Sequence, residues 1–184
     1  MKSLKEKDFL NQLTEKSRAS GDLHALGMIY EYYYPKILKY MYYRSNRSNY
    51  EDLTAETFHK VIKSIGSQEG NFEAWLYKIA ENVVKDFYKS KESKMRLWEN
   101  ILKFEKGPDK SGGALAGTEL RMDIHGVLES LDDEKRKILT LRFIQGFSSE
   151  EVAEITGKTS EAVRVMQFRA LVELRKTMLE EAAR

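Results

Sequence analysis

The sequence predicts an all-α protein made of two small helical domains joined by a flexible linker. Only two of the 184 residues are proline, while Leu, Glu, Lys and Ala are abundant, a composition that favours helix. No stretch alternates apolar and polar residues for long enough to predict a strand. Residues 107–117, GPDKSGGALAG, hold four of the eleven glycines, which is typical of a linker. We therefore expect a domain over residues 1–91, a linker over 92–117 and a second domain over 118–184.

Composition excludes several classes of protein. Lys and Arg total 31 and Asp and Glu total 29, so the net charge of +2 argues against a wholly basic packaging protein. The chain has no cysteine, which excludes disulfides, thiol catalysis and cysteine-ligated metals. Its apolar runs are far shorter than the ~20 residues of a membrane helix, and residues 1–10 lack the apolar core of a signal peptide. We expect a soluble, cytoplasmic protein with no membrane insertion and no cofactor.

Breaks in the apolar pattern divide the first domain into helices. Ser20-Gly21 separates the first two helices, and Pro35 is expected to open the third because proline suits a first helical position. The helices expected before the longest one cover residues 8–18, 22–34, 35–44 and 50–65.

An acidic edge lies on the helix over residues 50–65. Asp52 and Glu56 face away from its apolar side, with Leu53 at the margin. Such an edge could dock on a basic partner or could be an ordinary solvated face. Periodicity alone favours the solvated face.

Asn71 is expected to cap a longer helix that runs to about Lys89. One arc of this helix is apolar, and a second arc carries Asn71, Trp75, Lys78, Asn82, Lys85 and Lys89. Lysines attract phosphate, a Trp ring can stack on a base, and amides can pair with base edges. The alternative is a Trp at the core margin beside a solvated lysine face. The helical wheel alone leaves both interpretations open.

The second domain contains a helix-turn-helix pattern. After a helix over residues 132–145, Ser148 and Glu151 form a capping box that opens a short helix to about Thr156. Gly157 then supplies a turn, and Thr159 caps a longer helix that runs through Leu174. A two-turn helix, a glycine turn and a longer helix are typical of DNA-binding domains.

The longer helix of this pattern has the charge of a DNA-reading helix. Residues 158–176 contain five cations and two acids. Phe168 lies on the outward face with Arg164, and an exposed Phe is costly unless it contacts something such as a thymine methyl group. We interpret this helix as the one that enters the major groove.

The sequence gives little support for an enzyme. Gly157-Lys158-Thr159 has the tail of a phosphate-binding loop, but Val152 stands where that loop needs its first glycine. The three histidines have no metal-ligand spacing. We expect a protein that is not an enzyme, with no small-molecule substrate and no bound metal.

Taken in order, these features resemble the extracytoplasmic-function class of bacterial sigma factors over about residues 23–91 and 128–176. The motifs that resemble the second conserved region of the family are Tyr33-Tyr34-Pro35, Glu51-Asp52-Leu53, Glu56-Thr57-Phe58, Phe72-Glu73-Ala74-Trp75-Leu76 and Ile79-Ala80 with Asn82. Those that resemble the fourth are Leu141-Arg142-Phe143, Gly146-Phe147-Ser148, Glu150-Glu151-Val152-Ala153 and Ala162-Val163-Arg164. Several positions depart from the pattern. Glu81 stands where a basic residue commonly precedes Asn82, Leu131-Asp132 stands where Leu-Pro is frequent, and Ala55 stands where Gln is usual. The stretch after Asp86 is rich in Lys where Arg is typical, and Val165 and Gln167 are less usual in the recognition helix.

The resemblance implies a sigma factor that binds core RNA polymerase and promoter DNA, and that is held by an anti-sigma factor. The residues implied in polymerase binding are Asp52, Leu53 and Glu56. Those implied in reading and melting the −10 element are Asn71, Trp75, Lys78, Asn82 and Lys85. Those implied in reading the duplex −35 element are Arg142, Ser160, Glu161, Arg164, Phe168 and Arg169.

Two other functions remain as alternatives. A stand-alone helix-turn-helix regulator would use the first domain for dimerisation or sensing, and would bind duplex DNA without polymerase. A protein adaptor would use the acidic and aromatic faces and show no salt-dependent affinity for DNA. The Trp75–Lys89 arc favours the sigma factor, because a duplex-only binder has little use for a stacking surface.

Overall fold

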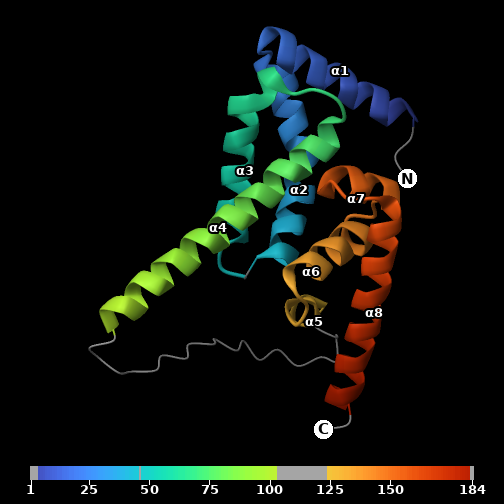
Figure 1. Ribbon diagram of the computed structural model, residues 1–184. Helices are drawn as coiled ribbons and strands as arrows, with labels where there is room; N and C mark the ends of the chain where they lie inside the picture. The colour runs from blue at the N-terminus through green and yellow to red at the C-terminus, as the bar shows by residue number, and fades with distance from the viewer. Residues whose placement is uncertain (1–3, 46, 103–123, 183–184) are drawn as a thin grey trace.

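The computed structural model describes residues 4–45, 47–102 and 124–182, and within those ranges all regular structure is helical (Figure 1). The first group of helices comprises α1 (Leu4–Ser20), α2 (Leu23–Arg44), α3 (Tyr50–Ser64), a short 3₁₀ turn (Ile65–Ser67) and α4 (Phe72–Leu102). The second comprises α5 (Ile124–Glu129), α6 (Asp133–Leu139), the π-helical η2 (Thr140–Ile144), α7 (Ser149–Thr156) and α8 (Ser160–Ala182). The all-α prediction is confirmed.

One apolar core runs through both groups. In the first group, residues at helical spacing from α2, α3 and α4 meet with almost no exposed surface, and they include Ile37, Met41, Val61, Leu76 and Val83. The same cluster continues into η2, α7 and α8 of the second group. Helix α4 is central to this arrangement, since it packs against α3 on one side and against α7 on the other.

Helix α2 is continuous where the sequence predicted a break at Pro35. Pro35 lies inside the helix and lacks the N–H that would reach the carbonyl of Glu31. Both residues are exposed, so water can bond to the freed carbonyl. On the other side of α2, Ile29, Tyr33 and Ile37 are buried and hold the two halves to the same core. Tertiary packing therefore overrides the local signal.

Helix α4 also runs further than predicted, to Leu102 rather than about Lys89. No glycine or proline occurs between Asn71 and Gly107, and the extra turns are rich in Lys and Glu, which favour helix. Residues 92–102 of the expected linker are therefore helical. The rest of the expected linker, residues 103–117, and residues 118–123 lie outside the described residues.

The caps of the second group match the sequence prediction. Ser148 accepts a hydrogen bond from the N–H of Glu151, whose carboxylate accepts one from the N–H of Ser148, which completes the capping box of α7. Gly157 ends α7 with φ of 68°, and the Oγ1 of Thr159 accepts the N–H of Ala162 at the start of α8. The helix-turn-helix is thus fixed by local hydrogen bonds.

Gly157→Ala should destabilise the protein by about 1–2 kcal/mol, because a side chain in the left-handed conformation brings its Cβ too close to the backbone. The added Cβ would meet no atom within 4 Å, so only this backbone strain acts. Gly27→Ala is the matched control, since Gly27 lies in α2, also in open space. It should stabilise the protein by roughly 0.5–1 kcal/mol. Urea denaturation of both variants checks the opposite signs, and equal effects would contradict this account of the turn.

Candidate nucleic-acid interfaces

Helix α8 presents one face to the core and one to solvent. Val163 and Ala170 have no exposed surface, while Phe168 is 68% exposed. Phe168 therefore stands out from α8 as the sequence predicted, on the face expected to enter the major groove. An aromatic side chain this exposed marks a surface that contacts something else.

Arg164 is held in place by acidic residues at the start of the helix-turn-helix. Its two Nη atoms donate to Glu150 Oε1 and to Glu161 Oε1, both at 3.0 Å, and to Ser160 Oγ at 3.2 Å. Hydrogen bonds from backbone N–H groups are the main reason that the pKa of both carboxyl groups is lowered. Arg164 lowers the pKa of Glu150 further, and Ser160 lowers that of Glu161 further. The guanidinium is therefore ordered but locally neutralised. Contact with DNA must exchange these carboxylates for bases or phosphates.

The other two arginines of the predicted −35 set lie elsewhere. Arg142, in η2, is half-buried, with its Nε donating to Gln167 Oε1 at 2.8 Å and its Nη1 donating to the carbonyl of Phe147. It thus joins the turn after η2 to α8. Arg169 is exposed but lines a hollow with Asp132 and Met166, beside the start of α6. Hydrogen bonds thus join Ser160 and Glu161 to Arg164, while Arg142 is bonded to Gln167 and Arg169 lies beside the start of α6.

The predicted −10 arc starts at Asn71, which caps α4. Its Oδ1 accepts the N–H of Glu73 at 3.1 Å and that of Ala74 at 3.3 Å. Its Nδ2 donates to Glu154 Oε2 of α7 at 2.9 Å. Asn71 is therefore a cap, as predicted, and it is also in contact with the second group of helices.

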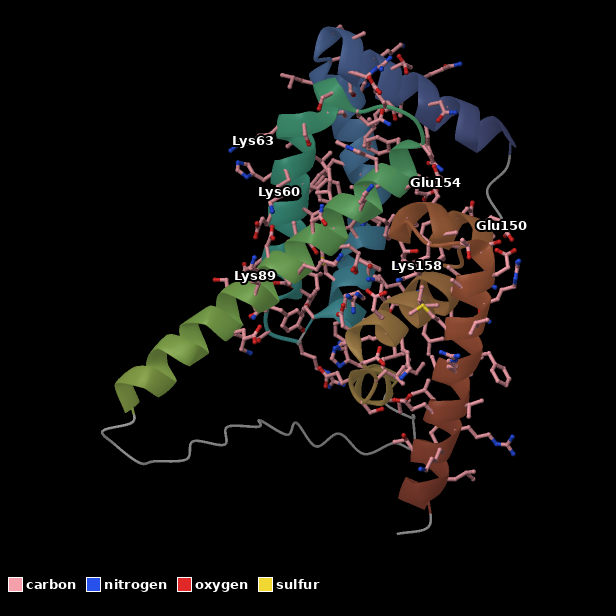
Figure 2. The ribbon with its side chains drawn as sticks, viewed as in Figure 1. Lys60, Lys63, Lys89, Glu150, Glu154 and Lys158 are labelled. Atoms are coloured by element: carbon pink, nitrogen blue, oxygen red, sulfur yellow. The ribbon has the colours of Figure 1, made fainter. Side chains whose placement is uncertain are left out.

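The rest of the arc is open to solvent. Trp75 is half-buried, and its ring centroid lies 5.6 Å from that of Phe72. It therefore packs at the margin of the core while part of its side chain stays exposed. Lys78, Asn82 and Lys85 are exposed. In Figure 2, Lys89 lies further along the same helix. This face of α4 offers an aromatic surface, an amide and lysines in one line.

The acidic edge of α3 is only partly as predicted. Asp52 and Glu56 are exposed, but Leu53 is 3% exposed and belongs to the core. Leu53 therefore supports the edge from beneath and does not form part of its surface. Glu56 also pairs with Lys60 at 3.4 Å, and Lys60 reaches Asp86 of α4 at 3.0 Å, so the edge is tied to α4 (Figure 2).

Sequence reasoning missed a cluster of buried charges between the two groups of helices. Glu81 of α4 is 4% exposed and pairs with Arg44 of α2, which has no exposed surface. Lys137 of α6 also reaches Glu81. One signal was present, because Glu81 replaces a basic residue common in the family that the chain resembles. Its partners are far away in the sequence and could not be found from spacing.

Two models of protein families match the chain, one in each group of helices. The model of Sigma-70 region 2 matches residues 29–94 and that of Sigma-70, region 4 matches residues 127–176, together more than half of the chain. The ECF RNA polymerase sigma factor BldN of Streptomyces coelicolor is 31% identical over 179 residues, covering 93% of this chain and 66% of BldN. RNA polymerase sigma factor YlaC of Bacillus subtilis is 30% identical over 155 residues, covering 82% of this chain and 90% of YlaC.

Two solved structures share the fold. CnrH, in complex with the cytosolic domain of CnrY, has a TM-score of 0.65 at 19% identity, over 94% of this chain and 96% of CnrH. The sigma factor RpoE, in complex with the anti-sigma factor NepR from Bartonella quintana, has a TM-score of 0.63 at 24% identity. That match covers 83% of this chain and 95% of the RpoE chain.

A helix-turn-helix is typical of DNA-binding proteins, and here a second group of helices carries a separate accessible face with Trp75, Lys78 and Asn82. Both halves match the regions of one family, and the chain belongs to the extracytoplasmic-function class of RNA polymerase sigma factors. It directs core RNA polymerase to promoters, and the stand-alone regulator is not favoured. The family consists of non-catalytic transcription initiation factors. Among the described residues, no helix is both long and apolar enough to span a membrane.

Proposed function

We propose that three surfaces of this sigma factor divide the work of promoter recognition. The α3 edge of Asp52 and Glu56 docks on basic helices of the polymerase clamp, the α4 arc captures the −10 element, and the start of α8 reads the −35 element. One observation carries the proposal: Trp75, Lys78 and Asn82 follow one another on an accessible face of α4, in a different group of helices from the helix-turn-helix. A protein that binds only duplex DNA needs no such face.

The α4 arc suits the capture of an unpaired strand. Extruding a base from a duplex costs a few kcal/mol. Stacking on an aromatic side chain returns roughly 1–3 kcal/mol per base, and lysines hold the backbone. Trp75 offers the stacking face, Lys78 and Lys85 offer charge, and Asn71 and Asn82 offer amides for base edges. The first domain, residues 1–91, would thus bind polymerase and open the −10 element.

The second domain, residues 118–184, would read the −35 duplex. Arg164 lies at the start of α8, where a recognition helix contacts base edges. Ser160 and Glu161 orient its guanidinium, and Phe168 lies one turn further along for a thymine methyl group or sugar. Arg142 would contact the DNA backbone, and Arg169 would lie in or along the major groove.

The partners follow from these tasks. The chain supplies no catalytic group of its own, because the polymerase carries out nucleotide chemistry, and it acts in the cytoplasm, where that enzyme works. The RpoE structure that it resembles is a complex with an anti-sigma factor. We infer that an anti-sigma factor also holds this chain until a signal releases it.

The test compares promoter binding with and without core polymerase. We expect the free protein to bind promoter duplex weakly and the protein with core enzyme to bind it tightly, as measured by fluorescence anisotropy at fixed salt. A tight, sequence-specific complex of the free protein with duplex DNA would instead support a stand-alone regulator. Lack of any salt-dependent DNA affinity in either case would support the protein adaptor.

Arg164→Ala and Arg142→Ala should have different effects on −35 recognition. Arg164→Ala should cost about 1–3 kcal/mol on the best −35 sequence and relax the preference at one base position, as loss of a bidentate base contact does. Arg142→Ala should weaken binding evenly across sequences and make the salt dependence shallower, as loss of a phosphate contact does. Holoenzyme binding to a randomised −35 library measures both effects, and exchanged phenotypes would exchange the two roles.

A further inference from the structure

The solvent-facing side of α8 carries an apolar stripe. On the opposite side Val163 and Ala170 are fully buried, and α8 packs there on α6 and α7, which Figure 1 shows between α8 and α4. The large apolar residues of the stripe are between 48% and 68% exposed: Val165, Phe168, Val172 and Leu179. They extend over about 21 Å of the helix. An exposed apolar surface of this length marks an interaction site.

DNA reading accounts for only the first half of this stripe. A recognition helix contacts base edges with its N-terminal residues, and Phe168 is the last residue of the stripe in the proposed −35 site. Val172 and Leu179 lie about 6 Å and about 16 Å further along the helix axis. The second half of the stripe therefore calls for a different partner.

The spacing of the stripe fits a helix as that partner. From Val165 the outward positions recur at intervals of three, four, three and four residues, and they reach Leu179 by way of Arg175. This is the spacing of the seam along which two α-helices pack side by side. We define the α8 seam as these five positions: Val165, Phe168, Val172, Arg175 and Leu179. Four of them are apolar.

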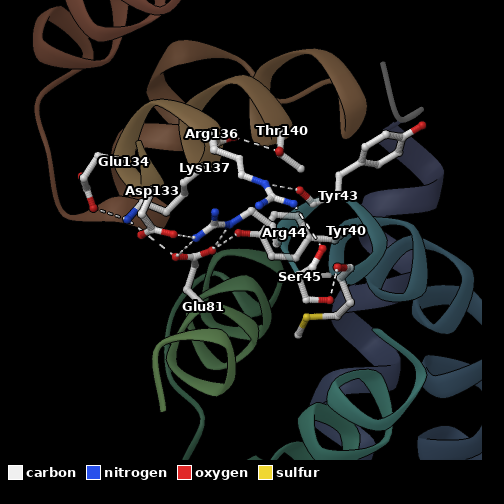
Figure 3. Close-up of polar contacts among 11 residues, drawn as sticks. Tyr40, Tyr43, Arg44, Ser45, Glu81, Asp133, Glu134, Arg136, Lys137 and Thr140 are labelled. Atoms are coloured by element: carbon white, nitrogen blue, oxygen red, sulfur yellow. Dashed lines mark hydrogen bonds and ion pairs between the residues drawn. The ribbon is translucent and has the colours of Figure 1, made fainter. Parts of the chain in front are cut away.

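Opposite charges lie at equal distances from Phe168. Glu161 lies seven residues before Phe168 and Arg175 lies seven residues after it, so each is about two turns away on the same side of α8. Both are exposed. Within one chain they are about 21 Å apart, too far to pair with each other. Charges on neighbouring helices do pair in this protein, as Arg44 of α2 does with acids of α4 and α6 (Figure 3).

A second copy of α8 in the antiparallel direction complements the seam. With Phe168 of one copy against Phe168 of the other, Glu161 of each copy faces Arg175 of the other, because both positions are equally far from Phe168. Val165 and Val172 lie three and four residues from Phe168, so they face each other within about 1.5 Å of the same level. The two phenyl rings meet at the centre, where an aromatic pair adds to the apolar contact. A parallel copy would place like charges side by side at both positions, which opposes binding.

We propose that the free chain forms an antiparallel homodimer along the α8 seam, and that this dimer covers the face of α8 that reads the −35 element. The dimer itself does not depend on the proposed function, whereas its effect on DNA reading rests on it. A self-complementary contact about a two-fold axis closes at two chains. The seam spans about two heptads, fewer than a typical coiled coil, so the dimer should be weak, with a Kd on the order of 10 µM. Glu161 and Phe168 lie within the contact, so a chain in the dimer cannot present them to DNA.

Sedimentation velocity of the full chain tests the dimer. Between about 1 and about 200 µM, the average mass should rise from that of one chain towards that of two. Arg175→Glu brings two carboxylates together at both ends of the contact, and Glu161→Arg brings two guanidinium groups together there. Each of these single variants should weaken self-association at least about tenfold.

Charge exchange tests the arrangement of the two copies. An equimolar mixture of the two single variants should associate again, because one chain then carries acids at both positions and the other carries cations at both. The double variant Glu161→Arg with Arg175→Glu should also associate as the unmodified chain does. If both single variants lose the dimer and neither the mixture nor the double variant recovers it, the antiparallel arrangement is overturned.

A lysine in the apolar part of the seam gives an independent test with a matched control. Val172→Lys should abolish the dimer, because Val172 lies outside the proposed −35 site but inside the contact. Ile62→Lys makes the same change on α3, where Ile62 is 52% exposed against 54% for Val172, and it should leave the average mass unchanged. Lys63→Glu, also on the surface of α3, is the control for charge reversal. Circular dichroism should show intact helices in all of these variants.

Two results of these measurements would overturn the proposal. A chain that stays a monomer at every concentration would exclude the dimer and leave the seam to a helix of another protein. A dimer that persists unweakened in both Arg175→Glu and Val172→Lys would exclude the seam as its contact.

Adding DNA separates this proposal from the proposed function. The duplex that holoenzyme selects from the randomised −35 library should dissociate the dimer, and a duplex of scrambled sequence should not, a result that supports both. A dimer that binds the selected duplex without dissociating would overturn the covering of the −35 face. Failure of holoenzyme to select any −35 sequence, with seam-dependent dimers still seen in the free chain, would count against the proposed function and support the dimer.

Discussion

Replacement of both Asp52 and Glu56 by lysine should abolish assembly with core RNA polymerase. The two carboxylates are exposed on α3, and the proposed site on the polymerase is basic. Like charges brought together at an interface cost several kcal/mol, so the two reversals should weaken binding by a factor on the order of a thousand. Native gel electrophoresis of the sigma factor titrated with core enzyme measures the loss.

The control for this variant carries the same change in charge elsewhere. Glu15→Lys with Glu31→Lys alters two exposed acids of α1 and α2 and should leave assembly unchanged. Circular dichroism should show intact helices in both variants, because none of the four side chains is buried. If the Asp52 and Glu56 variant still forms holoenzyme with unchanged affinity, polymerase docks on another surface.

Asn82→Ala and Trp75→Ala should each greatly reduce promoter opening while leaving −35 binding and assembly with core enzyme unchanged. In Trp75→Ala, loss of a stacking contact worth roughly 1–3 kcal/mol lowers the population of open complex by about 5- to 150-fold. Asn82→Ala removes an amide that would pair with a base edge. Asn82 is exposed, so its truncation leaves the core intact. Trp75 packs on Phe72, so its variant must first be shown to fold. Permanganate footprinting of the −10 element measures opening directly.

A promoter with mismatches across the −10 element supplies the second arm of this experiment. Its strands are already separate, so much of the activity of both variants should return. Lys63→Ala removes an exposed lysine from α3, outside the α4 arc, and should open the normal promoter at the unmodified rate. Normal opening in both arc variants, or no rescue on the mismatched promoter, would remove melting from this face of α4.

The features that the sequence predicted well depend on neighbouring residues. The cap at Asn71, the capping box at Ser148 and the left-handed Gly157 each involve groups within a few positions. The inward stripe of α8 follows from helical periodicity, and its Val163 and Ala170 are fully buried. Local hydrogen bonding and periodicity therefore predicted the helix-turn-helix in detail.

The features that the sequence did not predict depend on distant residues. Helix α2 passes through Pro35 because both of its halves pack on the same core, and no local signal reports that packing. The burial of Leu53 and the hydrogen bond from Arg142 to Gln167 likewise depend on how the helices pack together, which no local signal reports. Arg44 pairs with Asp133 across 89 positions, so neither residue indicates its partner.

The linker sequence did not predict that one domain docks on the other. Residues 107–117 predicted a linker that allows the domains to separate, because eleven extended residues can span up to about 36 Å. What holds them together is the burial of Tyr77 against Phe147 and the ion pairs of Arg44 with Asp133 and of Lys137 with Glu81. Length and composition set what a linker permits, while packing decides which arrangement is populated.

The most direct test of the central claim is run-off transcription with purified core polymerase on a library of genomic promoters. As a sigma factor, the protein should give transcripts from a small set of templates that share a −35 and a −10 element at constant spacing. Core enzyme alone should give none of these transcripts. If the protein binds core enzyme but the same templates stay silent, or if transcripts start without regard to sequence, the assignment as a promoter-directing sigma factor is contradicted.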